Sequence, residues 1–138
     1  MRVFPDTFEA KTGFDKIREM VAAKCLSSLG TRHVEKMKPS DDLKYLKRLL
    51  TQTEELRRLF AAGNRLPDAN YIDPAEQLAK MKVSGTYLEE EEAYDLKRSL
   101  STIMQLQSVL SKHAEECPTL HGLSGMVDLP ADIIKWFG

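Results

Sequence analysis

Residues 40–62 read SDDLKYLKRLLTQTEELRRLFAA and carry the clearest helical pattern in the chain. Apolar or uncharged side chains recur at spacings of three and four, which places them on one side of a helix: Leu43, Leu46, Leu49, Leu50, Thr53, Leu56 and Phe60. The charged residues fall on the other side: Lys44, Lys47, Arg48, Glu54, Glu55 and Arg58. Ser40, Asp41 and Asp42 form an N-cap cluster, and Gly63-Asn64 supplies a C-terminal stop. The stretch predicts a long amphipathic helix over about 40–62.

A second long helix is expected over about 89–113. Acidic residues Glu89 to Glu92 occupy its first turn and Lys112 its last, and both placements suit the helix dipole. Its main stripe consists of Ala93, Leu96, Leu100, Ile103, Gln107 and Leu110. At 1.5 Å per residue this helix would be roughly 36 Å long.

Shorter helices are expected around these two. Thr12 is predicted to cap a helix whose apolar stripe is Phe14, Ile17, Val21 and Cys25. Further short helices are predicted over about 31–37, after Asp73-Pro74, and over about 131–136. Period-two alternation, the sign of a strand, is absent. The sequence therefore predicts an all-α helical bundle with two long antiparallel helices, in which residues 1–138 form a single helical domain.

Composition sets limits on function. The chain has 138 residues, of which 42% are hydrophobic and 30% charged, so it can form a core. No apolar run approaches the ~18 residues of a membrane span, and no signal peptide is visible. Two cysteines are too few for a disulfide scaffold, so a cytoplasmic location is expected. The net charge of -1 gives no general attraction to nucleic acid, although basic residues exceed acidic ones in residues 1–69.

Motifs for chemistry are scarce. Neither the Gly-x4-Gly-Lys-Ser/Thr loop nor Gly-x-Gly-x-x-Gly occurs, so no nucleotide site is expected in this chain. His113, Cys117 and His121 have a spacing that can bind zinc, but Pro118 breaks the alignment and a fourth ligand is missing. His33 lacks a catalytic partner, and Cys25 fits a small core residue. The four acids at 89–92 point in different directions. We therefore expect no catalytic, cofactor-binding or metal-binding residue.

Two surfaces remain as candidate sites. The first consists of basic residues on the long helix, with a spacing that could follow a phosphate backbone: Lys44, Lys47, Arg48 and Arg58. The second is the apolar C-terminal segment, a candidate interface that contains Ile133, Ile134, Trp136 and Phe137. Trp and Phe are typical interface anchors, so this segment predicts weak self-association or a partner.

Several short motifs occur in an order that resembles a known family. They are Phe14-Asp15-Lys16-Ile17, Ser28-Leu29-Gly30-Thr31, Met37-Lys38-Pro39-Ser40-Asp41-Asp42-Leu43 and Thr53-Glu54-Glu55-Leu56-Arg57. This order resembles the start of the type-two MutS paralogues, the Smr-bearing branch of the MutS family. Tyr71-Ile72-Asp73-Pro74 and Leu88 extend the resemblance, which begins at about residue 8. Lys11-Thr12-Gly13 departs from the Leu-Glu that is usual there.

The resemblance implies that the chain is an N-terminal fragment of a core/lever region. The parent protein would then be an ATPase that uses ATP and Mg, and an endonuclease if it carries the Smr domain found in many members of the family. It would form a homodimer and bind mismatched or branched DNA, or the ribosomal RNA of collided ribosomes, in suppression of recombination, DNA repair or ribosome rescue. The fragment itself would be a structural and coupling module without enzymatic activity or cofactor, partnered by the rest of its parent and not by a membrane. The alternative is a free-standing helical interaction domain that docks a partner through its apolar C-terminal segment.

Overall fold

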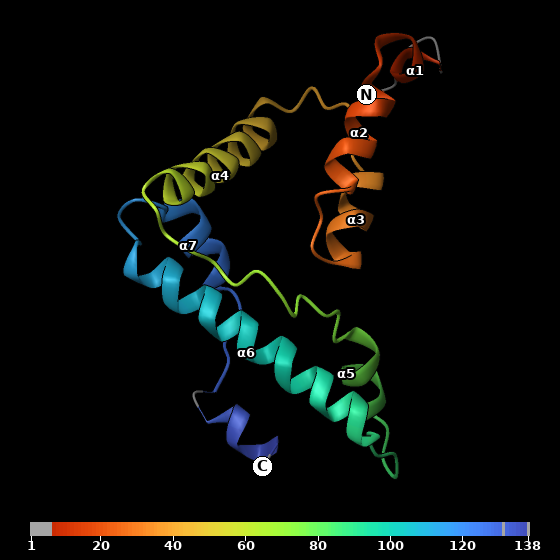
Figure 1. The fold of residues 1–138 in the computed structure, drawn as a ribbon, viewed down its shortest axis with the longest axis vertical. Helices are drawn as coiled ribbons and strands as arrows, with labels where there is room; N and C mark the ends of the chain where they lie inside the picture. The colour runs from red at the N-terminus through yellow and green to blue at the C-terminus, as the bar shows by residue number, and fades with distance from the viewer. Residues whose placement is uncertain (1–6, 131, 138) are drawn as a thin grey trace. The chain divides into compact units, whose positions relative to one another are not determined.

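The computed structural model describes residues 7–130 and 132–137, and Figure 1 shows that helices account for its regular structure. Their bounds are α1 (Phe8–Thr12), α2 (Phe14–Ala22), α3 (Ser28–Glu35), α4 (Leu43–Ala61), α5 (Ala75–Met81), α6 (Glu90–Lys112), α7 (Pro118–Ser124) and the 3₁₀ helix η1 (Ile133–Phe137). No strand occurs in the described ranges. The all-α prediction and its two long helices, α4 and α6, are confirmed.

The chain divides into two compact units, and the division falls inside α4 after Leu46. In the first unit α2 packs against α1 and α3. Arg18 of α2 connects the three helices, because its guanidinium donates to the carbonyl oxygens of Val34 (2.7 Å) and Met37 (3.0 Å) and pairs with Glu9 (2.7 Å). Val34 is the buried hydrophobic residue of this unit among the residues described. Arg18 of α2, bound to the end of α3, thus takes the place of a large apolar core in this unit.

Three sequence predictions for the first unit were wrong. Thr12 does not cap α2: it is the last residue of α1, and its hydroxyl donates to the carbonyl of Phe8 (2.9 Å). Cys25 lies after the end of α2 at Ala22. The next helix begins earlier than expected, since Ser27 caps α3 by accepting the N–H of Gly30 (3.1 Å).

Glycine suits position 30 inside this short helix because the Cys25 side chain lies close to its backbone. A Cβ at this position would lie 3.3 Å from both Cβ and Sγ of Cys25. A larger residue would therefore push against the segment that joins α2 to α3. The Ser28-Leu29-Gly30 sequence forms the start of α3.

The second unit is built on α6, which packs against α5, α7 and η1. Leu96 and Leu100 are buried along α6, as its predicted stripe requires. Near its C-terminal end, Leu110 joins Leu59 of α4 and Cys117 in one buried cluster, with Leu120 packed beside it. The two long helices therefore meet near their C-terminal ends, as Figure 1 shows.

The buried face of α4 differs from the predicted one. Glu55, expected on the solvated side, is only 6% exposed, and the neighbouring buried position is Leu59, which is 1% exposed. Leu50 and Phe60 of the predicted core stripe are 69% and 54% exposed. The amphipathic pattern is real, but its apolar side is not the side that α4 buries in this chain.

The connection between α4 and α5 runs along α6 (Figure 1). Two buried hydroxyl groups of α6 hold it: Ser99 donates to the carbonyl of Ile72 (2.8 Å), and Thr102 to that of Ala69 (3.4 Å). At the start of α6, Glu92 pairs with Lys80 of α5 (2.7 Å). Polar residues on α6 thus satisfy backbone groups that a loop must otherwise expose to water.

Among the described residues, none of the helices combines the length and apolar character that crossing a membrane requires.

Candidate functional site

Helix α7 is held by side chains of both long helices. The Glu55 carboxylate of α4 accepts the backbone N–H groups of Thr119 (3.1 Å) and Leu120 (2.9 Å) at the first turn of α7. These amides have no partner within their own helix, and a negative charge there also suits the helix dipole. Burial alone would raise the pKa of Glu55, but the two N–H donors hold it below its ordinary value. Glu55 therefore stays ionised although it is buried.

The other end of α7 is held by Gln107 of α6. Its Nε2 donates to the carbonyl oxygens of Ser124 (3.0 Å), the last residue of α7, and of Val127 (2.6 Å), which lies beyond it. These hydrogen bonds explain why a polar residue lies inside the apolar stripe of α6. We call Glu55 and Gln107 the α7 clamp, because each supplies the hydrogen-bonding groups that one end of α7 lacks.

The predicted basic residues on α4 are all exposed, at positions 44, 47, 48 and 58. Arg58 is paired with Glu54 (2.9 Å), which also binds Arg57 (2.7 Å). The hydrogen bonds from Arg57 and Arg58 lower the pKa of Glu54 to about 2. Arg58 also lines a hollow together with Glu115 and Glu116. Its surroundings are acidic, so of the four residues Arg58 has the least favourable setting for a phosphate.

The basic residues also share their side of α4 with the clamp. Glu55 follows Lys44 by eleven residues, which is about three helical turns, so both fall on one side. That side is exposed at Lys44, Lys47 and Arg48 but buried at Glu55. A ligand lying along it would therefore meet only the first half of α4.

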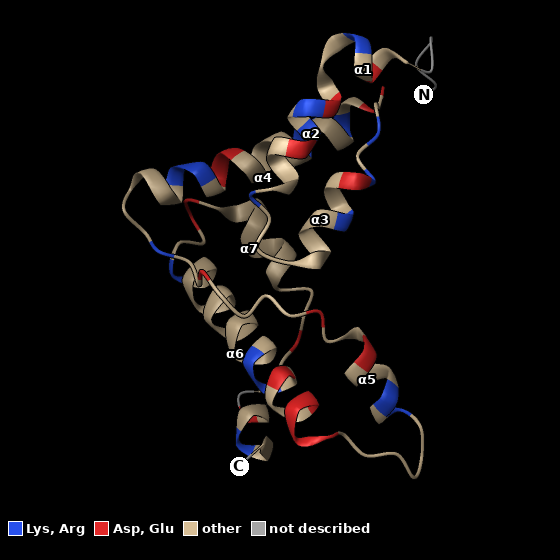
Figure 2. Ribbon diagram, turned by 45° about the vertical axis from the view of Figure 1, so that its right-hand side comes forward, with Lys and Arg blue, Asp and Glu red and all other residues tan. Residues whose placement is uncertain are grey.

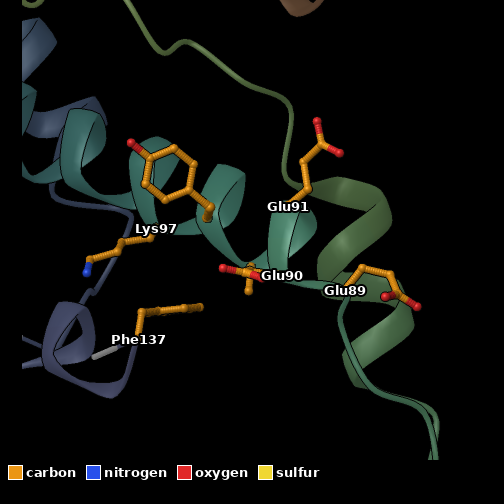
Figure 3. Close-up of a pocket in the computed structure, with 7 residues that line it drawn as sticks. Glu89, Glu90, Glu91, Lys97 and Phe137 are labelled. Carbon is orange, nitrogen blue, oxygen red and sulfur yellow. The ribbon is translucent and has the colours of Figure 1, made fainter.

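The C-terminal segment lies against α6 as η1. Ile133, Ile134 and Phe137 are half-buried, whereas Trp136 is 73% exposed. Phe137 lines a hollow of about 780 Å³ with residues at the start of α6, and Figure 3 shows its ring near Glu90 and Lys97. The acidic first turn of α6 and the basic segment that follows it are coloured red and blue in Figure 2. Three of the four predicted interface residues are thus partly covered by the chain's own helix.

The residues considered for metal or thiol chemistry are not brought together. In the described part of the chain, no group of three or more His, Cys, Asp or Glu side chains could hold a metal ion. His113 binds Glu116 (2.9 Å). Cys117 is fully buried and donates to the His113 carbonyl (3.1 Å), and burial raises the pKa of its thiol. Cys25 is half-buried, with its thiol near the Val21 carbonyl (3.5 Å).

Sequence reasoning missed Glu55 and Arg18 because both act on backbone groups distant in sequence. Glu55 was read as part of a charged face, and its partners lie 64 and 65 residues away. The available signal was Pro118, which marks a helix start whose free amides need an acceptor. Gln107 gave a clearer signal, since it is polar within an apolar stripe.

The relatives that a comparison with known proteins identifies all have the same name, Endonuclease MutS2. The chain is 30% identical over 112 residues to Endonuclease MutS2 of Geobacillus sp. (strain WCH70), which covers 79% of this chain and 14% of that protein. It is 29% identical over 114 residues to Endonuclease MutS2 of Symbiobacterium thermophilum, covering 83% of this chain and 14% of that protein. A third, from Exiguobacterium sibiricum, is 30% identical over 70 residues, or 51% of this chain and 9% of that protein.

The similarity extends over most of this chain but over only a small part of each relative, between 9% and 14% in these three proteins. No protein-family profile matches the chain. No solved structure matches it either. The relatives all carry the name that the sequence motifs indicate, and the chain is therefore related to the MutS2 proteins, the type-two branch of the MutS family.

Proposed function

We propose that this chain is a structural and coupling module of a MutS2-like protein that acts on DNA. The observation that carries the proposal is the apolar stripe of α4, which faces outward. Leu50 is 69% exposed and Phe60 54% exposed, although both belong to the clearest amphipathic pattern in the sequence. Burying one large apolar side chain contributes roughly 1.5–3 kcal/mol, so the stripe favours a covering partner.

The remainder of the parent protein is the partner that we propose. The relatives are several times longer than this chain, which spans about 9–14% of their length. A long helix that is buried on one side by α7 and apolar on the other can join two layers of a larger helical assembly. Movement of such a helix would transmit a change between the layers.

The finer parts of the proposal concern the parent. The relatives are named endonucleases, which supports a parent with nuclease activity. We propose further that the parent is an ATPase that uses ATP and Mg at sites outside this segment, and that it works as a homodimer. Its proposed target is branched or mismatched DNA, or a collided ribosome. Suppression of recombination, DNA repair and ribosome rescue are the corresponding roles.

The test compares the solvent access of α4 in the chain and in its parent. A Leu50→Cys variant is prepared in the 138-residue chain and in the full-length product of the same gene, and each is treated briefly with a maleimide. We expect position 50 to be modified in the chain and protected in the parent. Met126→Cys serves as the matched control, because Met126 is 80% exposed and lies outside α4. Equal modification of position 50 in both proteins would contradict the proposal.

Sequencing of the gene separates this proposal from a free-standing interaction domain. The proposal requires a Gly-x4-Gly-Lys-Ser/Thr loop encoded beyond position 138, because ATP binding needs backbone amides in such a loop. A gene without it would leave the free-standing domain as the better reading. The exposed Trp136 is then the residue to test as its anchor.

A further inference from the structure

A polar groove runs along α6 on the side that faces the connection between α4 and α5. It consists of two adjoining hollows, of about 270 and about 360 Å³, which share Pro67 and Gln105. Both belong to the second unit. Neither contains a residue of the α7 clamp or of the basic α4 positions. At its Tyr94 end the groove adjoins the hollow of Phe137, which Tyr94 and Lys97 also line.

The α6 wall of the groove presents polar groups at helical spacing. Arg98, Ser101, Gln105 and Ser108 are separated by three, four and three residues, so they share one side of the helix. At 1.5 Å per residue the row is about 15 Å long. The row is therefore long enough to contact more than one phosphate of a single strand.

Basic side chains outnumber acidic ones in the lining of the groove itself. Arg65, Lys97 and Arg98 line it, and Asp68 is the acidic lining residue. A second acid, Asp95, pairs with Arg98 Nη2 (2.8 Å). Glu89, Glu90 and Glu91 line the adjoining hollow that shares Tyr94 and Lys97, so the acidic side chains gather at the Tyr94 end and Arg65 lies at the other. The Arg98 Nε is buried and has no hydrogen-bond partner among the described residues, so one donor of this guanidinium is left unused.

An aromatic side chain stands at one end of the groove. Tyr94 is 58% exposed and lines the end of the groove that also contains Lys97 and Arg98. The Arg98 guanidinium lies 5.1 Å from the centroid of the Tyr94 ring. Sites for single-stranded nucleic acid combine a basic groove, which follows the backbone, with aromatic rings on which bases stack. The tyrosine and the row of donors have this arrangement.

The facing wall is held in place by the body of the unit. Thr102 of α6 donates to the carbonyl of Ala69 (3.4 Å), and the neighbouring Asn70 has a left-handed φ of 62°. Asparagine is among the residues that adopt this conformation most readily, so it suits the turn at this position. The groove is thus bounded by a helix on one side and a tethered turn on the other.

We propose that this α6 groove binds single-stranded nucleic acid, with Arg65, Lys97 and Arg98 on the phosphodiester backbone and Tyr94 stacked on a base. The proposal rests on the proposed function only in that the parent acts on nucleic acid. It differs from the sequence-based expectation, because it places the contact on α6 and not on the basic side of α4. The two locations can be compared in one experiment.

The experiment measures fluorescence anisotropy of a labelled oligothymidine of about 20 nucleotides with the 138-residue chain, at salt concentrations from about 50 to about 200 mM. We expect wild-type binding that weakens with salt. Arg65→Gln/Arg98→Gln should weaken it about tenfold or more and lower the salt slope by about two, since two phosphate contacts are lost. The matched control, Lys44→Gln/Lys47→Gln, removes two cations from α4 and should leave the affinity within about twofold.

Further variants test whether a loss of binding comes from the groove itself or from misfolding. Gln105 is exposed, so Gln105→Glu changes the charge of the groove without disturbing the core, and it should also weaken binding. Gln52→Glu adds the same charge on α4 and should not. Tyr94→Leu should reduce the affinity with little change in salt slope, because stacking carries no charge. Circular dichroism of each variant checks that the helices persist.

Three results would overturn the proposal. The first is no binding of oligothymidine at the lowest salt, and the second is loss of binding in the α4 variant but not in the groove variants. The third is that inorganic phosphate displaces the oligothymidine more strongly than chloride does at the same ionic strength, which would indicate a small-anion site. The protection of position 50 in the parent is a separate measurement. The groove proposal can therefore be wrong while the proposed function is correct, and the reverse also holds.

Discussion

Glu55 and Gln107 hold opposite ends of the same short helix. The Glu55 carboxylate accepts the N–H of Leu120 at 2.9 Å, and the Gln107 amide donates to the carbonyl of Val127 at 2.6 Å. One residue comes from α4 and the other from α6, so α7 is fixed between the two long helices by its backbone. A helix of seven residues has little stability of its own. The contacts at its two ends therefore supply stability that a longer helix would gain from its own hydrogen bonds.

The first prediction concerns Glu55→Gln. The amide keeps the shape of the carboxylate but loses its charge, so the two backbone donors lose a charge-assisted partner. We expect a loss of about 1–2 kcal/mol in the free energy of unfolding, measured by urea denaturation. Glu115→Gln, on an exposed side chain of the same unit, is the control and should stay within about 0.5 kcal/mol. Equal effects of the two substitutions would show that the clamp contributes nothing at this end.

The second prediction is a loss of stability in acid. The pKa of Glu55 lies below its ordinary value of 4.5 in the folded chain, because the N–H groups of Leu120 and Thr119 outweigh burial. Its contribution is therefore complete above about pH 4.5 and disappears as the pH falls through the lower, folded pKa. Lys80 lowers the pKa of Glu92 in the same direction. Melting temperatures recorded from about pH 6 to about pH 3 should fall, and Glu55→Gln should make this fall shallower. Parallel curves for the two proteins would exclude Glu55 as a source.

The third prediction tests the other end of the clamp. Gln107→Leu keeps the volume of the side chain but removes the donor to Ser124 and Val127. We expect hydrogen exchange in residues 118–127 to accelerate, because two carbonyl groups lose their partner and the end of α7 frays. Gln105→Leu, two residues earlier and exposed, should leave exchange in that segment unchanged. If α7 exchanges at the same rate in both variants, the amide of Gln107 is not what holds it.

Local features of the helices could be predicted from sequence because they depend on nearby residues. Asp42 accepts the N–H of Tyr45 (3.0 Å), as its position before α4 predicts. Glu92 accepts the N–H of Glu89 (2.8 Å) at the start of α6. The stripe of α6 was also correct at Leu96 and Leu100, because this helix is surrounded by parts of its own chain.

The side of α4 that is buried could not be predicted in the same way. A stripe such as Leu50 and Phe60 shows which side avoids water, but not which molecule covers it. Glu55 is buried because a helix start lies opposite it, and nothing near Glu55 in the sequence contains that information. The same holds for Arg18, whose acceptors are the carbonyl groups at the end of another helix.

The fourth prediction concerns Arg18→Met. This substitution keeps the apolar stem and removes the donors to Val34 and Met37 as well as the pair with Glu9. Hydrogen bonds to a charged group contribute about 1.5–3 kcal/mol, so protection of residues 8–37 against hydrogen exchange should fall accordingly. Lys16→Met, an exposed position on the same helix, should have a small effect. Unchanged protection in the Arg18 variant would mean that apolar contacts alone hold the three helices together.

The fifth prediction compares the two cysteines. Cys117 is 0% exposed, and burial together with the nearby Glu55 and Glu116 raises the pKa of its thiol. The thiolate is the form that reacts with iodoacetamide, and a buried thiol is also out of its reach. We therefore expect the half-buried Cys25 to be alkylated at least about tenfold faster in the native chain, as followed by peptide mass spectrometry. The difference should disappear in denaturant, where both thiols are accessible, and Glu55→Gln should speed the reaction of Cys117 by loosening α7. Native rates that are equal for the two cysteines would mean that the cluster of Leu59, Leu110 and Cys117 opens readily.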